Sequence, residues 1–394
     1  AYHFKFVTGI SLFANLIAVP LTNILLTPLV FAAAIFAVTI PSLAAPVWKL
    51  SGLITQIFMK FTVFVSDVGE PLVFHWAPSI FEVVTLYLII ISILFWRRHR
   101  PAKFAALFLI FIFVTEVSYK IIVPHFDKNL TITVLDVNQG DSTLVRFPGG
   151  KTLLMDGGGL KGSHFDVGKN VVAPALWSMG VYHLDYVLLT HPHFDHFQGL
   201  SFIIKEFEPE LLFTNGENAP DYEMSEWNNF QTQLETSHIP IRIIEQNYYE
   251  NINGVDFKII AVPKMVGDDP NDDALVVYLR YGENKFLFPS DLTKIGEGRL
   301  LNVTDDLKTD FLKVGHHGSK NSTTELFLKE VVPSIAVVSA GEGNRYGMPH
   351  KSIIQKLENT GAKIFRTDKG GAITVVSDGK KMIVSDTLCD KACP

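Results

Sequence analysis

The sequence has almost no cysteine, because only Cys389 and Cys393 occur among its 394 residues and both lie in the last six positions. A disulfide framework is therefore excluded. A free pair in a terminal tail, a local disulfide, and a lipid or metal attachment remain as interpretations. A signal peptide with a charged start and a cleavage site is also missing. The chain starts at Ala1 within an apolar pattern, and we interpret it as a fragment or a processed chain.

Charge is scarce in the first third of the chain. Residues 1–126 contain 8 Lys+Arg and 4 Asp+Glu, whereas residues 127–394 contain 26 and 36. The mean hydropathy of +0.24 and the 30 phenylalanines are high for a soluble protein. We therefore expect an apolar, slightly basic first part before an acidic globular part. The acidic balance of the second part argues against strong nonspecific DNA binding by bulk electrostatics.

Long apolar stretches in the first part predict membrane helices. Residues Val7–Ile40 are almost uncharged and too long for one simple span, which indicates one long broken helix or a tight helix pair. Residues Leu53–Val65 suit a helix along the membrane interface or against partner helices. Two runs of 20 residues, Ala77–Trp96 and Phe104–Val123, predict transmembrane spans.

The loop between the last two runs sets the expected orientation. Residues Arg97–Lys103 hold half of the positive charge of the first part, and short loops rich in Lys and Arg are cytoplasmic. We therefore expect a cell-membrane protein with several spans, in which residues 127–394 are extracytoplasmic. The predicted domains are a membrane part over 1–126, a hydrolase part over 127–388 and a tail over 389–394.

A cluster of potential metal ligands follows the apolar run Tyr186–Leu189. Its sequence is Thr190-His191-Pro192-His193-Phe194-Asp195-His196, and we name it the metal loop. The run predicts a buried strand, so the loop lies at a strand's C-terminal end. His191 and His193 can face one side and Asp195 and His196 another, which would hold two cations. These ligand types suit Zn²⁺, Mn²⁺ or Fe, and a histidine-rich surface loop is the alternative.

Short strands and helices alternate through the second part. The predicted strands are 131–137, 143–147, 151–155, 186–189, 211–213, 241–244, 257–262, 274–281, 285–288, 311–314, 335–339, 363–365, 372–377 and 381–385, and the predicted helices are 167–179, 221–236 and 351–359. Several strands end in carboxylates or histidines, namely Asp156, Asp291 and the pair His316/His317. This recurrence is expected of a metal site on the rim of a sheet sandwich. The glycines after Asp156 let the backbone come close to that site, where Asp156 could orient a ligand histidine; a plain glycine turn is the alternative.

The spacing His191-x-His193-x-Asp195-His196, with the later Asp291 and His316/His317, resembles the metallo-β-lactamase fold. The resemblance implies an α/β fold, an αββα sandwich with one or two metal ions, preceded here by the helical transmembrane region. Further motifs resemble the ComEC family of DNA-uptake competence proteins: 14–20, 135–142, 156–159, 313–320 and 344–350. In that family the order is a competence membrane domain and then the hydrolase domain.

The resemblance implies roles for individual residues. His191 and His193 would bind the first metal ion, and Asp195, His196 and either His316 or His317 the second, with Asp291 bridging. Asp195 and His317 are the predicted catalytic residues, and Asp195 or a metal-activated water would handle the proton. Ser319, Lys320 and Ser322 could contact phosphate, although helix capping explains the two serines equally well.

The sequence departs from the wider family in one ligand. The third histidine of the first metal site has no obvious counterpart, because His238 is the only histidine between His196 and Asp291 and suits an ordinary loop. Asn271, Asp272 or Asp273 could substitute for it. Met348 stands where related sequences usually have a histidine.

The expected function is metal-dependent cleavage of one strand of incoming DNA, with one or two Zn²⁺ or Mn²⁺ ions. Expected partners are DNA, the membrane, the remaining N-terminal part of the channel and other competence proteins. Two alternatives stay open. One is a membrane-tethered hydrolase of a small or cell-wall substrate, such as a phosphoester, lactone or β-lactam, which uses the same metal centre. The other is a transport subunit that binds DNA without catalysis.

Overall fold

The computed structural model describes residues 6–69, 73–163, 165–265, 269–304 and 306–388. Cys389 and Cys393 lie outside the described residues. The chain divides into two compact units, residues 1–109 and 110–394. The boundary that we place between residues 126 and 127 stays a prediction.

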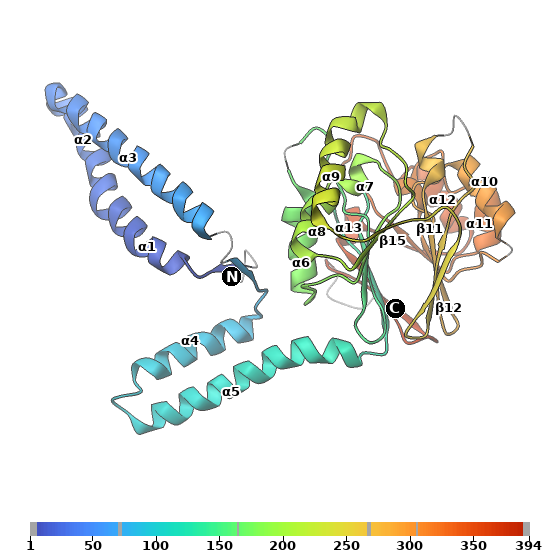
Figure 1. Ribbon diagram of the computed structural model, residues 1–394, viewed down its shortest axis with the longest axis horizontal. Helices are drawn as coiled ribbons and strands as arrows, with labels where there is room; N and C mark the ends of the chain where they lie inside the picture. The colour runs from blue at the N-terminus through green and yellow to red at the C-terminus, as the bar shows by residue number, and fades with distance from the viewer. Residues whose placement is uncertain (1–5, 70–72, 164, 266–268, 305, 389–394) are drawn as a thin grey trace. The chain divides into compact units, whose positions relative to one another are not determined.

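The first unit is mainly helical, and one of its helical runs is interrupted. The run consists of α1 (Ser11–Pro20), the π-helical turn η1 (Leu21–Leu26) and α2 (Thr27–Thr39), so the long stretch is one broken helix (Figure 1). Pro20 lacks the N–H that an α-helical bond needs, which accounts for the change of winding after it. Helix α3 (Pro41–Gly69) packs along α2 and contains the stretch 53–65.

The other elements of this unit include a shorter helix than we expected. Helix α4 spans Ile80–Leu94, not the 20 residues from Ala77 to Trp96. It starts late because Ser79 and Glu82 form a capping box, in which the Ser79 hydroxyl accepts from the Glu82 N–H at 3.0 Å. Fifteen residues reach about 22 Å, less than the ~30 Å of a bilayer's apolar core. Strands β1 (Phe6–Thr8) and β2 (Val73–His75) pair antiparallel.

Helix α5 (Arg100–Ile122) crosses from the first unit into the second and continues into η3 (Val123–Phe126). It contains the span predicted over Phe104–Val123. Among the described residues, two helical runs are long and apolar enough to cross a membrane, Phe13–Thr39 and Arg100–Phe126.

The second unit is built on two sheets packed face to face. The eight-stranded sheet has the order β17-β16-β3-β4-β5-β6-β7-β8 and the seven-stranded sheet the order β15-β14-β13-β12-β11-β10-β9 (Figure 1). The first sheet consists of β3 (Leu130–Val134), β4 (Thr143–Arg146), β5 (Thr152–Met155), β6 (Tyr186–Leu189), β7 (Leu211–Thr214), β8 (Ile241–Ile243), β16 (Ile373–Ser377) and β17 (Met382–Asp386). The second consists of β9 (Tyr248–Ile252), β10 (Val255–Ile260), β11 (Val276–Tyr281), β12 (Asn284–Phe288), β13 (Phe311–Lys313), β14 (Ile335–Val338) and β15 (Lys363–Arg366).

Helices cover the outer faces of both sheets, which confirms the αββα sandwich. The segments between strands of the first sheet are η4 (Gly168–Val172), α6 (Ala173–Ser178), α7 (Phe194–Phe197), α8 (Leu200–Phe207), η5 (Asp221–Glu223) and α9 (Met224–Ser237). Those associated with the second sheet are η6 (Pro270–Asp273), α10 (Lys294–Val303), η7 (Gly315–Gly318), α11 (Glu325–Val331), α12 (Lys351–Asn359) and α13 (Thr367–Gly370).

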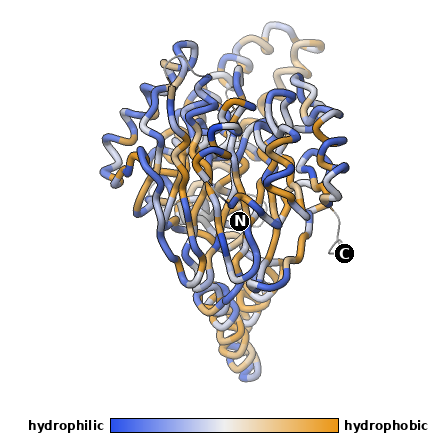
Figure 2. The backbone as a smooth tube through the Cα atoms, turned by 90° about the vertical axis from the view of Figure 1, so that its right-hand side faces the viewer, coloured by the Kyte–Doolittle hydropathy of each residue, from blue (hydrophilic) through white to orange (hydrophobic). Residues whose placement is uncertain are grey.

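The core follows from the alternation of side chains along each strand. On β13, Phe311 enters the cluster between the sheets, whereas Leu312 enters the cluster under α11 and α12. Both faces of β13 are thus buried, and Figure 2 shows that many of the apolar residues lie in the middle of the sheets. Burial on both faces fixes the strand ends, and with them the loops that carry the polar residues.

Candidate metal centre

The metal loop leaves β6 and turns into α7, a single helical turn. The His196 N–H donates to the His193 carbonyl at 2.9 Å, which closes this turn. Because β6 is buried and paired on both sides by β5 and β7, the start of the loop is held firmly. His191 and His196 are fully buried, and His193 is half-buried.

His191 and His193 present two nitrogens to one point. The His191 Nε2 and His193 Nδ1 atoms lie 3.1 Å apart. Two imidazole nitrogens can bind the same ion at this separation, since each metal–nitrogen bond is about 2.0–2.1 Å long. The Thr190 hydroxyl donates to Asp156, so its oxygen accepts from His191 Nδ1 at 3.1 Å and leaves His191 Nε2 as the ligand atom.

Asp156 orients the third histidine of the loop. It is 3% exposed, and its Oδ2 atom accepts from His196 Nδ1 at 2.9 Å. Its other oxygen accepts from the Thr190 N–H at 2.9 Å. The hydrogen bond to Nδ1 orients the His196 ring and leaves Nε2 as the nitrogen that faces the metal centre.

The loop histidines differ in charge. Burial lowers the pKa of His191 well below its ordinary value, and it also lowers the pKa of His193, so both rings are neutral at pH 7. Burial acts in the same direction on His196, but the carboxylates of Asp156 and Asp291 outweigh it and raise its pKa well above the ordinary value. The first two rings are therefore ready to bind a metal ion, and the third holds a proton that a metal ion would replace.

Glycines let the backbone after β5 approach the metal loop. The Gly157 N–H donates to the His196 carbonyl at 2.7 Å, and the Gly199 N–H donates to the Gly158 carbonyl at 2.9 Å. A Cβ atom on Gly199 would lie 2.0 Å from the Gly157 oxygen, closer than any side chain permits. Only glycine fits this contact.

Asp291 and His317 bring the second sheet to the metal loop. Asp291 follows β12, and its Oδ2 atom lies 3.4 Å from His196 Nε2 and 3.5 Å from His317 Nε2. Asp195 Oδ2 lies 3.6 Å from the same His317 nitrogen. His317 Nδ1 donates to the Ser339 carbonyl at 3.1 Å, which again leaves Nε2 as the free atom. Burial opposes ionisation of Asp291, but the nearby histidines outweigh it and hold its pKa well below the ordinary value.

The turn η7 distinguishes the two neighbouring histidines. His316 and His317 both adopt positive φ angles, 49° and 53°. His317 is consequently buried at the centre, whereas the His316 side chain is 22% exposed and its Nε2 atom lies 3.9 Å from Asp291. Positive φ angles at two adjacent non-glycine residues indicate backbone strain, and strain of this kind clusters at functional sites.

Asp141 is a neighbour of the centre that our sequence reasoning missed as a site residue. Asp141, His196, Asp291 and His317 offer potential ligand atoms within 4.8 Å of one another. However, Asp141 forms a buried ion pair with Lys313, and its Oδ1 atom lies 3.5 Å from His317 Nδ1. We therefore assign Asp141 to the orientation of His317. In the sequence, the position of this carboxylate directly after the turn 138–140 was the signal that could have indicated a site residue.

The free polar atoms at this centre fit a metal ion. Among the described residues, several buried side-chain atoms here have no hydrogen-bond partner: His193 Nε2, His196 Nε2, Asp291 Oδ1, His316 Nδ1 and His317 Nε2. Buried polar atoms are rarely left unpaired in proteins. Imidazole nitrogens and a carboxylate that converge without partners are the donor set for Zn²⁺ or Mn²⁺.

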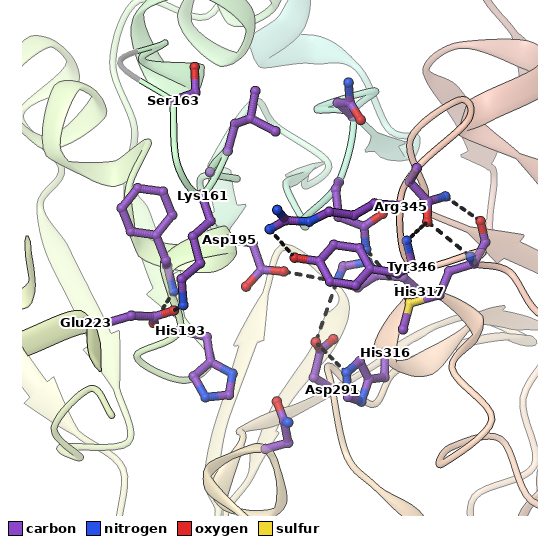
Figure 3. Close-up of a pocket in the computed structure, with 18 of the residues that line it drawn as sticks. Lys161, Ser163, His193, Asp195, Glu223, Asp291, His316, His317, Arg345 and Tyr346 are labelled. Carbon is purple, nitrogen blue, oxygen red and sulfur yellow. Dashed lines mark hydrogen bonds and ion pairs between the residues drawn. The ribbon is translucent and has the colours of Figure 1, made fainter. Parts of the chain in front are cut away.

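A cavity of about 600 Å³ opens over these residues (Figure 3). We name it the site cavity, and its floor contains His193, Asp195, Asp291, His316 and His317. One wall carries Lys161, Tyr222 and Glu223, and the other carries Asn344, Arg345, Tyr346 and Met348. A cavity of this size admits a group much larger than one phosphate.

Comparison with known proteins decides the family. The model of the metallo-beta-lactamase superfamily matches residues 135–342, more than half of the chain, and that of competence proteins matches residues 1–100. The chain belongs to the metallo-beta-lactamase superfamily.

Curated relatives match this chain across both its helical part and its metallo-beta-lactamase part. ComE operon protein 3 of Bacillus subtilis is 28% identical over 94% of this chain and 49% of its own length. Competence protein ComA of Neisseria gonorrhoeae is 27% identical over 94% of this chain and 48% of its own length. The chain thus spans about half the length of these relatives. Their match, together with the match of residues 1–100, confirms the resemblance to ComEC-type competence proteins.

Solved structures that are similar to this chain have low sequence identity to it. A metallo hydrolase from Ignicoccus hospitalis is 13% identical, with a TM-score of 0.39 over 62% of this chain and 98% of its own.

Three residues could substitute for the missing histidine, namely Asn271, Asp272 and Asp273. Of these three, Asn271 lines the site cavity. It is 8% exposed, and its Nδ2 atom donates to Asp269 at 2.9 Å. Its Oδ1 atom has no hydrogen-bond partner in the described part of the chain. Asp272 instead accepts from the N–H groups of Thr293 and Gly296 at the start of α10. His238 is exposed at the end of α9.

Three residues predicted to contact phosphate do not line the site cavity. The Ser322 hydroxyl is fully buried and donates to the Gly315 carbonyl at 3.0 Å. Ser319 is 6% exposed and accepts from the Asn321 N–H at 3.3 Å, whereas Lys320 is exposed. Neither serine caps α11, whose N-cap is Thr324. The two serines stabilise the loop that carries His317.

Proposed function

We propose that this chain is part of a DNA-uptake protein and that its hydrolase unit cleaves phosphodiester bonds in one strand of incoming DNA. The observation that carries the proposal is the set of buried, unpartnered His and Asp atoms on the floor of a cavity wide enough for a nucleotide. The competence-type membrane part supplies the context, since a simple esterase does not need several membrane helices.

The ligand assignment combines the two converging nitrogens of His191 and His193 with free atoms of the other residues. His191 Nε2, His193 Nδ1 and Asn271 Oδ1 would hold one divalent ion, Zn²⁺ or Mn²⁺. His196 Nε2, His317 Nε2 and Asp195 would hold the second, and Asp291 would lie between the two. His316 stands at the rim as a further donor. Divalent ions in such a centre lower the pKa of water and neutralise charge that develops on phosphorus.

The chain's own residues position the reaction. Asp195 is partly exposed to the site cavity, where it can accept a proton from an attacking water. Asp156 and the Ser339 carbonyl keep His196 and His317 in the orientations that point Nε2 inwards. Lys161 and Arg345 are cations on the cavity walls, and they provide a local attraction for phosphate that the acidic unit as a whole lacks.

The membrane orientation completes the proposal. We place the hydrolase unit outside the cytoplasm of a multi-span cell-membrane protein, as the basic loop 97–103 predicts. Expected partners are the remaining N-terminal part of the channel and other competence proteins.

A direct test uses the full chain purified in detergent micelles and stripped of metal. Mn²⁺, Zn²⁺ or Mg²⁺ is added separately, and cleavage of end-labelled single-stranded DNA is followed. We expect metal-dependent cleavage that Asp195→Ala lowers by about 10²–10⁴-fold, the range typical of a lost acid–base group. Asp256→Ala removes an exposed carboxylate of β10 and should leave the rate unchanged.

Two outcomes would contradict the proposal. Turnover of a small ester or lactone without DNA cleavage would favour the tethered hydrolase. Binding of DNA without turnover of either substrate would favour a transport subunit that lacks catalysis.

A further inference from the structure

Two cation–tyrosine pairs stand on opposite walls of the site cavity. On one wall, the Lys161 Nζ atom lies 4.0 Å from the centre of the Tyr222 ring. On the other, the Arg345 guanidinium lies 4.9 Å from the centre of the Tyr346 ring and donates to its hydroxyl at 2.8 Å (Figure 3). The walls come from different sheets, because Lys161 and Tyr222 follow β5 and β7, whereas Arg345 and Tyr346 follow β14.

The first wall is tied to the metal loop. The Lys161 Nζ atom forms an ion pair of 2.8 Å with Glu223 Oε1. Glu223 is 5% exposed, and its other oxygen accepts from the Phe194 N–H at 2.9 Å. Phe194 lies between His193 and Asp195, so one buried carboxylate links the cation to two proposed ligands.

The second wall is held just as firmly. The Asn344 side chain donates to the carbonyls of Gly341 and Met348 at 2.8 and 2.5 Å. It also accepts from the N–H groups of Tyr346 and Met348 at 3.2 and 3.1 Å. After this loop, the His350 N–H donates to the carbonyl of Gly318, next to His317, at 3.0 Å. Glu223, next to Tyr222, and the loop that carries Tyr346 are therefore both tied to segments that carry the metal centre.

The exposure of the rings is unusual for aromatic residues that stabilise a fold. Tyr222 is 69% exposed and Tyr346 is 46% exposed, although both line the cavity above the metal centre. An exposed aromatic ring offers a face for a flat aromatic group, and the cation beside it favours negative charge. The ligand that combines a flat aromatic group with a phosphate is a nucleotide.

We propose that Tyr222 and Tyr346, each with its cation, form a clamp that stacks unpaired nucleobases on both sides of the phosphate to be cleaved. This inference rests on the proposed nuclease function and adds its substrate class, which is single-stranded nucleic acid. In the interior of a duplex the base faces are covered by neighbouring base pairs, so a tyrosine there can stack only on a base that is unpaired. The clamp would therefore select the single strand at the cavity itself.

The test compares substrates that differ only in their bases. One is an end-labelled single strand of DNA, the second is its duplex, and the third is a strand of the same length whose central residues are abasic. The full metal-loaded chain in micelles is expected to favour the normal single strand. For Tyr222→Ala and Tyr346→Ala, the loss of kcat/KM on the normal strand should exceed the loss on the abasic strand by about 10-fold, mainly through KM. Tyr346→Phe keeps the ring and should retain most of the preference.

A matched control exists elsewhere on the same unit. Tyr249 is 64% exposed, and the Lys258 Nζ atom lies 5.0 Å from its ring centre, but neither residue lines the site cavity. Tyr249→Ala should therefore leave the preference for the normal strand intact.

Binding of the metal-free chain to the same strands, followed by fluorescence anisotropy, separates this inference from the proposed function. Weaker binding of Tyr346→Ala to the normal strand but not to the abasic strand would support the clamp even if no DNA were cleaved. Equal losses on both strands, or equal use of single strand and duplex by the unchanged chain, would overturn it while leaving nuclease activity in place.

Discussion

At the scale of single residues, the metal centre joins the metal loop to side chains that are distant in the sequence. Four potential ligands within six positions of the loop are a strong local signal, and the structure brings His191, His193 and His196 together with Asp291. The choice between His316 and His317 was not predictable. It depends on two successive positive φ angles, a conformation that is uncommon for any residue other than glycine.

The choice among Asn271, Asp272 and Asp273 shows the same limit. Pro270–Asp273 forms a 3₁₀ helix, in which successive side chains point about 120° apart. Asp272 thus turns towards the start of α10, where it accepts from Thr293, and Asn271 lines the site cavity. A sequence in which three adjacent residues are all polar does not specify which one faces the metal centre.

We predict that Asn271 contributes to metal binding through its amide oxygen. Asn271→Ala should weaken binding of one of two Mn²⁺ ions by about 10-fold or more, because a ligand is lost. Asn271→His should instead strengthen Zn²⁺ binding, because imidazole suits Zn²⁺ better than an amide oxygen does. Calorimetric titration and the metal content after dialysis measure both effects. Asn229→Ala, an exposed change on α9, is the control, and unchanged metal binding in Asn271→Ala would contradict the assignment.

At the scale of elements, hydrophobic pattern predicted most of the sandwich. Strands such as Tyr186–Leu189 and helix Lys351–Asn359 have the predicted bounds, because a buried strand and an amphipathic helix each leave a clear period. Strand β9, Tyr248–Ile252, was missed. It lies at the edge of its sheet and alternates exposed and half-buried side chains that are mostly polar, so its sequence lacks an apolar face.

The backbone after β5 also lies very close to the backbone at the start of α8. The glycines after Asp156 predicted that the backbone comes near the site, but their partners are distant in sequence. Gly199 lies against both Gly157 and Gly168, at contact distances that exclude a Cβ atom. The elements η4 and α8 can therefore reach the metal loop only because three glycines meet there.

We predict that Gly199→Ala destabilises the hydrolase unit strongly. The new Cβ atom would lie 2.0 Å from the Gly157 oxygen, and backbone atoms must move to remove the clash. Overpacking of this kind costs about 1–3 kcal/mol of unfolding free energy, occasionally more. Thermal and urea unfolding of the full chain in micelles, followed by near-UV circular dichroism, measures the effect.

Gly298→Ala serves as the matched substitution for this experiment. Gly298 lies in α10, and a Cβ atom there meets nothing within 4 Å. Alanine favours a helix over glycine by about 0.5–1 kcal/mol, so this variant should be as stable as the parent or more so. Equal stability of the two variants would show that the contact at Gly199 relaxes without cost.

At the scale of the whole molecule, charge and hydropathy differ between the mainly helical unit and the unit that contains the sandwich. The length of α4 was not predictable from hydropathy, because a capping box inside the apolar run sets where the helix begins. The orientation argument consequently rests on α5 and its continuation, Arg100–Phe126. This run spans about 40 Å, which exceeds the ~30 Å apolar core of a bilayer, and it begins beside the basic loop.

We predict that loop 97–103 faces the cytoplasm and that the sandwich faces the outside. Cys389 and Cys393 are first replaced by serine, and single cysteines are then introduced at His99 or at Asp378, which is exposed in the turn between β16 and β17. A membrane-impermeant maleimide applied to intact spheroplasts should label Asp378→Cys and spare His99→Cys, and permeabilisation should make both react. The physical reason is that four cationic side chains in a short loop resist transfer across the bilayer. Labelling of His99→Cys alone would reverse the orientation, and the sandwich could then meet DNA only after it had crossed the membrane.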